Sequence, residues 1–327
     1  MGDTAELRSY GDRMDLIDDP AVQITGLTKR YGDRVAVDGV DLAVGRGEVF
    51  GLLGANGAGK TTMVECAQGL RRPDGGSVRV LGLDPLRQRS RLASRIGSQL
   101  QHSELPDRMR VGEAIRLFAD GPVPDAAVEE WGLGELWRVP FGALSGGQQQ
   151  RLFIGLALLT QPAVVFLDEL TQGLDPAARR AVWGLIAAIR DRSTTVVLVT
   201  HFADEAEVLC DRLAVMRRGR IVAEGTPGEL IDRHGQGLTM SFTLPEADVA
   251  ALRAVPGVEA VVVSGPRVEL HGRRTMVAHV GAHLVGRATP DRPVPDDIHV
   301  TEPSLEAALI RLIDDPDTPM PEEVLAS

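Results

Sequence analysis

The sequence predicts an α/β protein with a mixed sheet at its core. Three short stretches are almost continuously apolar, which is typical of parallel strands covered on both faces. They are Glu48–Leu53, Ala163–Leu167 and Thr195–Thr200. Longer stretches with apolar residues at helical spacing lie between them. The 327 residues, 43% hydrophobic and 25% charged, suffice for one large core and a second small domain.

The chain begins with an acidic stretch that lacks apolar periodicity, and we expect residues 1–20 to be a flexible tail. From Ala21 apolar and polar residues alternate on both sides of the turn Tyr31-Gly32-Asp33. This pattern predicts two antiparallel strands, which form an antiparallel β subdomain beside the main sheet.

A glycine-rich loop follows the first buried strand and precedes a helical stretch, Met63–Leu70. It fits the pattern Gly, four residues, Gly, Lys, then Ser or Thr, which holds phosphates on backbone N–H groups and a helix N-terminus. Lys60 supplies a point charge, and the Thr61 hydroxyl is a ligand for Mg²⁺. The alternative, a glycine-rich turn that binds nothing, is disfavoured by the strand-loop-helix context. The candidate phosphate-binding residues are Gly54, Asn56, Gly57, Ala58, Gly59, Lys60, Thr61 and Thr62.

The next segment alternates turns, strands and helices. We expect, in order, a turn over Arg72–Ser77, strands at Val78–Leu83 and Ile96–Gln101, and helices at Val111–Ala119 and Asp125–Leu136 separated by Gly121–Pro124. An arginine-rich stretch of helical character, Arg87–Arg95, precedes the second strand. Such a stretch is typical of a solvated face; the alternative is contact with lipid headgroups or a partner.

A second anion-binding helix N-terminus is predicted at Leu144–Arg151, directly before an apolar helix over Leu152–Thr160. Ser145 can cap the helix, while Gly146 and Gly147 leave the backbone open. Taken alone, a Ser-Gly-Gly cap is a common pattern.

Polar side chains follow two of the buried strands. Asp168 and Glu169 end one, and carboxylates there need hydrogen bonds or a cation such as Mg²⁺. Asp175 reads as the N-cap of a helix that begins with Pro176. The strand Thr195–Thr200 delivers His201 to the same end of the sheet, beside the phosphates.

These motifs, in this order, resemble the ATPase subunit of an ATP-binding cassette (ABC) transporter over residues 21 to about 230. The Leu-Ser-Gly-Gly-Gln signature at 144–148 is diagnostic, since most other phosphate-loop enzymes lack it. The resemblance implies a P-loop NTPase fold with a short helical subdomain at about 102–160, within a nucleotide-binding domain spanning 21–234. It implies ATP and Mg²⁺ as cofactors.

The resemblance also implies roles for individual residues. Tyr31 looks like the aromatic that stacks on adenine, although local evidence alone favours a tyrosine that packs against its own hairpin. Gln101 looks like the glutamine that contacts Mg²⁺ and couples to transport, and Asp168 like the metal-shell carboxylate. Glu169 looks like the residue that polarises the attacking water, with Lys60 and His201 as the catalytic contacts to phosphate. The remaining candidate nucleotide contacts are Ser145, Gly146, Gly147, Gln148 and Asp175.

In the mechanism that the resemblance implies, two copies bind head to tail. Each ATP lies between the phosphate loop of one copy and the signature of the other. One set of motifs per chain requires two chains. ATP binding brings the copies together and hydrolysis releases them, since only the γ-phosphate bridges both surfaces.

The C-terminal part, 235–315, is expected to be a small accessory α/β domain, followed by a tail at 316–327. The expected elements are strands at Leu238–Leu244, Val258–Val263 and Val268–His271 and helices at Ala247–Val255 and Arg274–Val285. The stretch Glu302–Leu312 is similar to the closing helix of drug- and antibiotic-export ATPases that pair with a separate ABC-2-type permease. The alternative is any small regulatory domain.

Composition limits the location and the partners. The net charge of −11 argues against a nucleic-acid surface covering the whole protein, although it is compatible with a local basic patch. No nucleic-acid partner is expected. The sequence shows no secretory signal, no window of about 18 apolar residues, and two cysteines that read as reduced core residues. We expect a cytoplasmic protein held at the inner face of the cell membrane by a permease.

Two departures from the family pattern leave alternatives open. Leu170 stands where the family usually has proline after the catalytic glutamate, which adds an N–H donor and puts the turnover rate in doubt. The stretch from Gln101 to Leu144 is short, so a helix of the subdomain is expected to be missing or reduced. The alternatives to an exporter are a soluble ABC-type switch acting on nucleic acid or ribosomes and a regulatory protein with slow hydrolysis.

Overall fold

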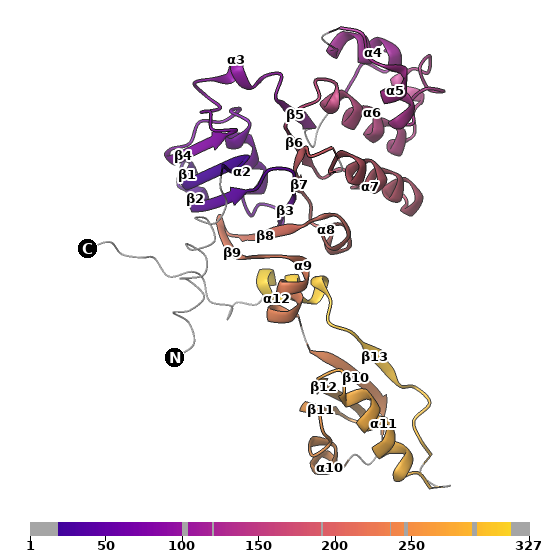
Figure 1. Cartoon of the computed structure of the whole chain (residues 1–327). Helices are drawn as coiled ribbons and strands as arrows, with labels where there is room; N and C mark the ends of the chain where they lie inside the picture. The colour runs from indigo at the N-terminus through magenta and orange to yellow at the C-terminus, as the bar shows by residue number, and fades with distance from the viewer. Residues whose placement is uncertain are drawn as a thin grey trace, which may run out of the picture. The chain divides into compact units, whose positions relative to one another are not determined.

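The computed structural model of the chain describes residues 19–99, 104–119, 121–190, 192–235, 237–244, 248–289 and 293–314. The chain divides into two compact units (Figure 1). Unit 1 extends to Pro227 and takes in the residues from Leu312, and unit 2 is Gly228–Arg311.

A six-stranded sheet forms the centre of unit 1 and confirms the predicted mixed sheet. Its order is β5-β6-β7-β3-β8-β9. Neighbouring strands are parallel, except that β9 is antiparallel to β8. β3, β6 and β7 are buried along their whole length, as continuous apolar runs predict. The strands are β3 Val49–Leu53, β5 Ile96–Gln99, β6 Val164–Asp168, β7 Thr195–Val199, β8 Arg212–Arg217 and β9 Arg220–Gly225.

An antiparallel sheet of order β2-β1-β4 packs against the central sheet through a shared apolar core. Its strands are β1 Val22–Tyr31, β2 Arg34–Val44 and β4 Gly75–Val80. The predicted strand Val78–Leu83 was placed three residues too late. Gly75 and Gly76, expected in a turn, lie in β4, where Gly75 pairs with Thr28. Leu81 then ends the strand with φ of 52°.

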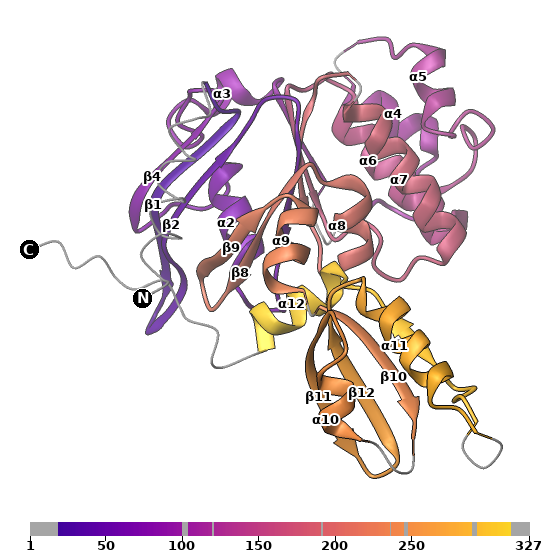
Figure 2. The same cartoon turned by 60° about the horizontal axis from the view of Figure 1, so that its bottom comes forward.

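Seven α-helices are described in unit 1 up to Leu209: α2 Lys60–Ala67, α3 Arg89–Leu92, α4 Val111–Phe118, α5 Asp125–Glu130, α6 Gly146–Leu158, α7 Pro176–Arg190 and α8 Ala203–Leu209. Helices α4, α5 and α6 share a small apolar core of their own and form the helical subdomain (Figures 1 and 2). The predicted helix to Leu136 was too long, because Gly132 with φ of 63° follows α5. The helix expected from Leu152 begins at Gly146.

Unit 2 is an α/β unit, as predicted. Its antiparallel sheet has the order β11-β12-β10-β13, with one face covered by an apolar core that includes residues of α10 and α11. Strand β13 was not predicted; it is only three residues long and exposed. The elements from residue 227 onward are α9 Pro227–His234, β10 Leu238–Thr243, α10 Val249–Arg253, β11 Val258–Ser264, β12 Arg267–Gly272, α11 Met276–Gly286, β13 His299–Thr301 and α12 Leu305–Asp314. Among the described helices, none has both the length and the apolarity that a membrane span requires.

Candidate active site

In the glycine-rich loop between β3 and α2, two positions have a backbone conformation and surroundings that only glycine can adopt. Gly54 and Gly59 have φ of 150° and 109°. A Cβ at Gly54 would lie 2.2 Å from the carbonyl oxygen of Met216, and one at Gly59 would lie 2.1 Å from that of Ala36. The loop is therefore packed tightly against β8 and β2, and its shape is fixed before any ligand binds.

Lys60, the first residue of α2, is only 5% exposed. Its Nζ donates to the carbonyl oxygens of Gly54 at 2.7 Å and Ala55 at 3.1 Å, so the ammonium group curls back over the loop. Burial lowers the pKa of this group, while the nearby carboxylates of Glu169 and Asp168 act in the opposite direction. The loop lysine and the two strand-end acids therefore belong to one site.

Asp168, at the end of β6, is 4% exposed, and its Oδ1 has no hydrogen-bond partner. Burial, followed by the Glu169 charge, raises the pKa of Asp168 to about 6, although a hydrogen bond from Thr61 lowers it. A buried carboxylate oxygen without a partner, beside a threonine hydroxyl, is an oxygen donor set suited to Mg²⁺. No cluster of three or more His, Cys, Asp or Glu residues in the described ranges forms a metal cage. Mg²⁺ needs none, since it keeps waters and substrate phosphates as ligands.

Glu169 and His201 meet just beyond the ends of β6 and β7. Glu169 has φ of 49°, an uncommon conformation for a residue with a side chain, and its N–H donates to the carbonyl oxygen of Val199 at 2.9 Å. His201 Nδ1 lies 3.6 Å from Glu169 Oε1. Leu170, where the family usually has proline, is fully buried. A carboxylate and an imidazole thus stand side by side next to the phosphate loop.

The second predicted anion site is the N-terminus of α6. Ser145 Oγ accepts from the Gln148 N–H at 3.3 Å, and the Gln148 side chain accepts from the Ser145 N–H at 2.8 Å. This capping box fixes the start of the helix while Ser145 and Gly146 remain exposed. In the part of the chain that the structure describes, no hydrogen bond or ion pair joins Ser145–Gln148 to the phosphate loop.

The other predicted residues lie apart from this cluster. Asp175 caps α7 by accepting from the N–H groups of Ala178 and Ala177, and these bonds lower its pKa. Tyr31, at the end of β1, is 41% exposed, and Lys29 Nζ and the Arg71 guanidinium each lie 5.5 Å from its ring centroid. Gln101 lies outside the described residues.

One buried acid beside the site escaped the sequence analysis. Glu205 in α8 is fully buried, and Trp183 Nε1 donates to its Oε1 at 3.2 Å. Burial raises its pKa, which hydrogen bonds from Thr200 and Trp183 partly offset. The available signal was a glutamate on the same helical face as Leu209, where an apolar residue is expected.

Comparisons with known proteins were made for the sequence and for the fold. Residues 37–172 match the family described as ABC transporter. The chain is 36% identical over 314 residues to the daunorubicin resistance ATP-binding protein DrrA3 of Streptomyces coeruleorubidus, covering 91% of this chain and 97% of that protein. It is 37% identical over 277 residues to the Nod factor export ATP-binding protein I of Rhizobium sp. (strain N33), covering 77% and 90%.

Solved structures show the same fold. The ATP-binding subunit of an ABC transporter is 25% identical with a TM-score of 0.59, over 65% of this chain and 92% of that one. The cbiO1 protein of Clostridium perfringens, described as part of the ABC transporter complex cbiONQ, is 27% identical with a TM-score of 0.57, over 66% and 92%.

Proposed function

Because the chain belongs to the ABC transporter family, we propose that it forms a head-to-tail dimer that hydrolyses ATP to power export through a separate membrane permease. The resemblance that the sequence motifs indicated is therefore confirmed, both for the family and for its ATPase activity. One observation supports the assignment of the reaction site above all others. Lys60, Asp168 and Glu169 interact electrostatically, and His201 lies against Glu169.

The roles of these side chains follow from the chemistry of phosphoryl transfer, which is catalysed mainly by positioning and by stabilising charge. The loop N–H groups and Lys60 bind the outer phosphates. Glu169 orients and polarises the attacking water, and its carboxylate lies 3.6 Å from His201 Nδ1. His201 holds the γ-phosphate from the neighbouring strand end. The buried surroundings exclude bulk water and strengthen each charge interaction.

Thr61 and Asp168 are the residues that would hold Mg²⁺. When bound, Mg²⁺ neutralises charge on the phosphate oxygens. The Asp168 oxygen that has no partner supports this assignment.

The dimer is proposed because one chain carries a single phosphate loop and a single signature. The exposed N-terminus of α6, with Ser145 and Gly146 at its tip, offers backbone N–H groups to a phosphate held by a second copy. Gln148 supports Ser145 through the capping box, and Asp175 holds the neighbouring helix start. Tyr31 stacks on the adenine from the exposed end of β1.

The permease and its cargo are proposed by analogy with the relatives. Those relatives are named for daunorubicin resistance and for Nod factor export, which favours an exporter over a soluble switch on nucleic acid or ribosomes. We propose an ABC-2-type permease as the partner, a small drug-like or lipid-like molecule as the cargo, and a position at the inner face of the membrane. Co-purification of the full-length chain with a multi-spanning protein that changes its ATPase rate tests this part.

The reaction site is tested by Glu169→Gln. This change keeps the shape of the side chain but removes the charge that polarises water, so hydrolysis should fall by at least about 100-fold while ATP still binds. The variant should accumulate as an ATP-bound dimer in size-exclusion chromatography. The matched control is Glu207→Gln on the exposed face of α8, which should hydrolyse ATP like the wild type. Wild-type turnover in Glu169→Gln would contradict the assigned role.

A further inference from the structure

We propose that the arginines of the segment 86–95, here called the arginine strip, bind an anionic membrane surface directly, without the permease. The strip is Leu86-Arg-Gln-Arg-Ser-Arg-Leu-Ala-Ser-Arg95 and contains no acidic residue. It therefore carries four positive charges in a chain whose net charge is −11. The inference rests on the proposed function only in taking the inner face of the membrane as the surface available to the chain.

The strip is anchored in the core by one buried side chain, and its arginines are exposed to solvent. Its one helical turn, α3, inserts Leu92 into the main core of unit 1, where this side chain is 3% exposed. All four arginines face solvent, and the side chain of Arg87 is 88% exposed. A buried anchor and an outward cationic face hold the charges on one surface before any partner binds.

Three of the four arginines of the strip also lack an ion-pair partner among the described residues. Within the described ranges the nearest carboxylate to Arg87 is that of Asp84, at 3.7 Å, and no ion pair is found for Arg89, Arg91 or Arg95. Several other exposed arginines in the described ranges are paired with a carboxylate, among them Arg71, Arg192, Arg233, Arg273, Arg274 and Arg287. Charges left unpaired on a rigid surface are free to meet an external anion.

The strip is accompanied by an apolar residue and a further cation. Leu86 is 42% exposed, and with Arg72 and Arg87 it lines an open cavity of about 620 Å³. Asp74 and Asp84 also line this cavity. Asp74 is engaged by Lys29 and by the Arg30 N–H, and Asp84 accepts from the N–H groups of Leu86 and Arg87. A cationic surface with an exposed leucine at its border is suited to the headgroup region of an anionic bilayer.

A membrane fits these observations better than a nucleic acid does. No aromatic residue lies in the strip to stack on bases, and the rest of the chain is acidic. In both views of the molecule, α3 lies at the same end of unit 1 as the helical subdomain (Figures 1 and 2). We take this end of unit 1 as the one that faces the membrane in the proposed function, which places the strip on the membrane side.

Vesicle sedimentation of the purified full-length chain tests the proposal. The chain should bind phosphatidylcholine vesicles that contain about 30 mol% phosphatidylglycerol and should not bind pure phosphatidylcholine, and added salt should weaken the binding. An arginine near an anionic surface contributes about fivefold to binding, so replacing all four with serine (R87S/R89S/R91S/R95S) should weaken it by more than about 50-fold. The lysine version of the same four changes should retain most of the binding, because the charge is kept.

The matched control removes four exposed arginines from unit 2, in the variant R253S/R273S/R274S/R287S. It changes the net charge by the same amount and should bind vesicles like the wild type. The basal ATPase rate of the strip variant should equal that of the wild type, so a loss of vesicle binding is distinguishable from a failure of the proposed ATPase site. Three outcomes would overturn the proposal. They are an equal loss of vesicle binding in both serine variants, wild-type vesicle binding by the strip variant, and no vesicle binding by the wild type. Strip-dependent binding of an oligonucleotide without vesicle binding would also overturn it and would assign the surface to nucleic acid.

Discussion

Asp168 brings a carboxylate to a place where water cannot stabilise it. Its Oδ1 is buried without a partner, and its pKa is raised to about 6, above the value near 3.9 of an unfolded chain. The folded protein therefore holds this proton more tightly than the unfolded chain. As the pH rises from about 4 to 6, the free energy of unfolding falls, because the folded protein must then hold an ionised carboxylate in a buried position. Above about pH 6 this destabilisation is fully present. A shift of about two units corresponds to about 3 kcal/mol.

Asp168→Asn should remove the destabilisation that the buried Asp168 charge causes. Without nucleotide and Mg²⁺, we expect the variant to exceed the wild type in free energy of unfolding by up to about 3 kcal/mol at pH 8, and the difference should shrink below pH 5. Urea denaturation across this pH range measures it. Addition of Mg²⁺ and ATP should stabilise the wild type more than the variant, since only the wild type has the metal carboxylate. A difference independent of pH would show that burial of the Asp168 charge is not its cause.

At the residue scale, the sequence could predict the members of the site better than their surroundings. Asp168, Glu169 and His201 were predicted to lie together because each stands at the end of a buried strand, and the carboxyl ends of parallel strands meet at one edge of a sheet. Lys60 was predicted to join them because the phosphate loop follows a third buried strand of the same sheet. Glu205 was missed because its burial depends on packing between α7 and α8, which leaves no motif in the sequence.

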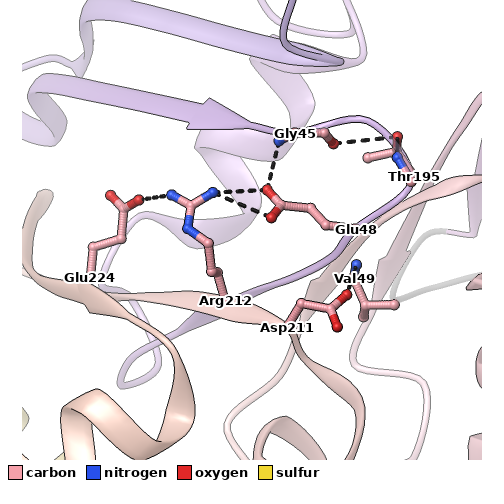
Figure 3. Close-up of polar contacts among 8 residues, drawn as sticks. Gly45, Glu48, Val49, Thr195, Asp211, Arg212 and Glu224 are labelled. Atoms are coloured by element: carbon pink, nitrogen blue, oxygen red, sulfur yellow. Dashed lines mark hydrogen bonds and ion pairs between the residues drawn. The ribbon is translucent and has the colours of Figure 1, made fainter. Parts of the chain in front are cut away.

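At the element scale, a polar cluster joins the start of β3, the strand that leads into the phosphate loop, to β8 and β9 (Figure 3). Arg212 at the start of β8 pairs with Glu224 of β9 and donates to Glu48, just before β3, at 3.0 and 3.3 Å. Glu48 also accepts from the Gly45 N–H at 2.6 Å. The cluster joins three neighbouring strands at the edge opposite the phosphate loop.

Arg212→Met should destabilise unit 1 strongly. It removes the guanidinium that both the Glu48 and the Glu224 carboxylates contact, and these carboxylates are only 16% and 9% exposed. Breaking a buried pair in this way costs about 3 kcal/mol, which urea denaturation measures. The triple variant E48Q/R212M/E224Q removes the two carboxylate charges as well and should recover much of the loss. If the single and triple variants were equally unstable, the loss would come from the contact between the Arg212 guanidinium and the Phe50 ring rather than from uncompensated carboxylates.

Element identities were easier to predict than element boundaries. The buried strands and α7 carry strong apolar patterns and appeared where predicted. The start of β4 was predicted too late because the pair Gly75-Gly76 usually signals a turn. Here a Cβ at Gly76 would clash with Gly26, so this glycine marks a close approach between β4 and β1. Such contacts depend on strand pairing and are invisible to local patterns.

At the scale of the whole molecule, the proposed dimer makes each ATP site a composite of two copies. Lys60 of one copy and the α6 N-terminus of the other act on the same nucleotide, and a copy defective in either should be inactive as a homodimer. Lys60→Ala removes the phosphate charge. Gly146→Asp places a carboxylate at the first position of α6, where it favours the helix but repels phosphate. A Cβ at Gly146 meets only Leu174, at 3.5 Å, so the fold tolerates the change.

Mixing the two inactive variants should restore ATP hydrolysis. In a mixed dimer, one site combines both lesions, and the other combines an intact loop with an intact helix N-terminus. Random exchange makes half of the dimers mixed, each with one working site, so roughly a quarter of the wild-type rate is expected. Mixing either variant with a copy that carries both changes is the control and should restore nothing. If loop and signature of the same chain formed the site, every site in the mixture would carry a lesion, and the mixture would be as inactive as its parts.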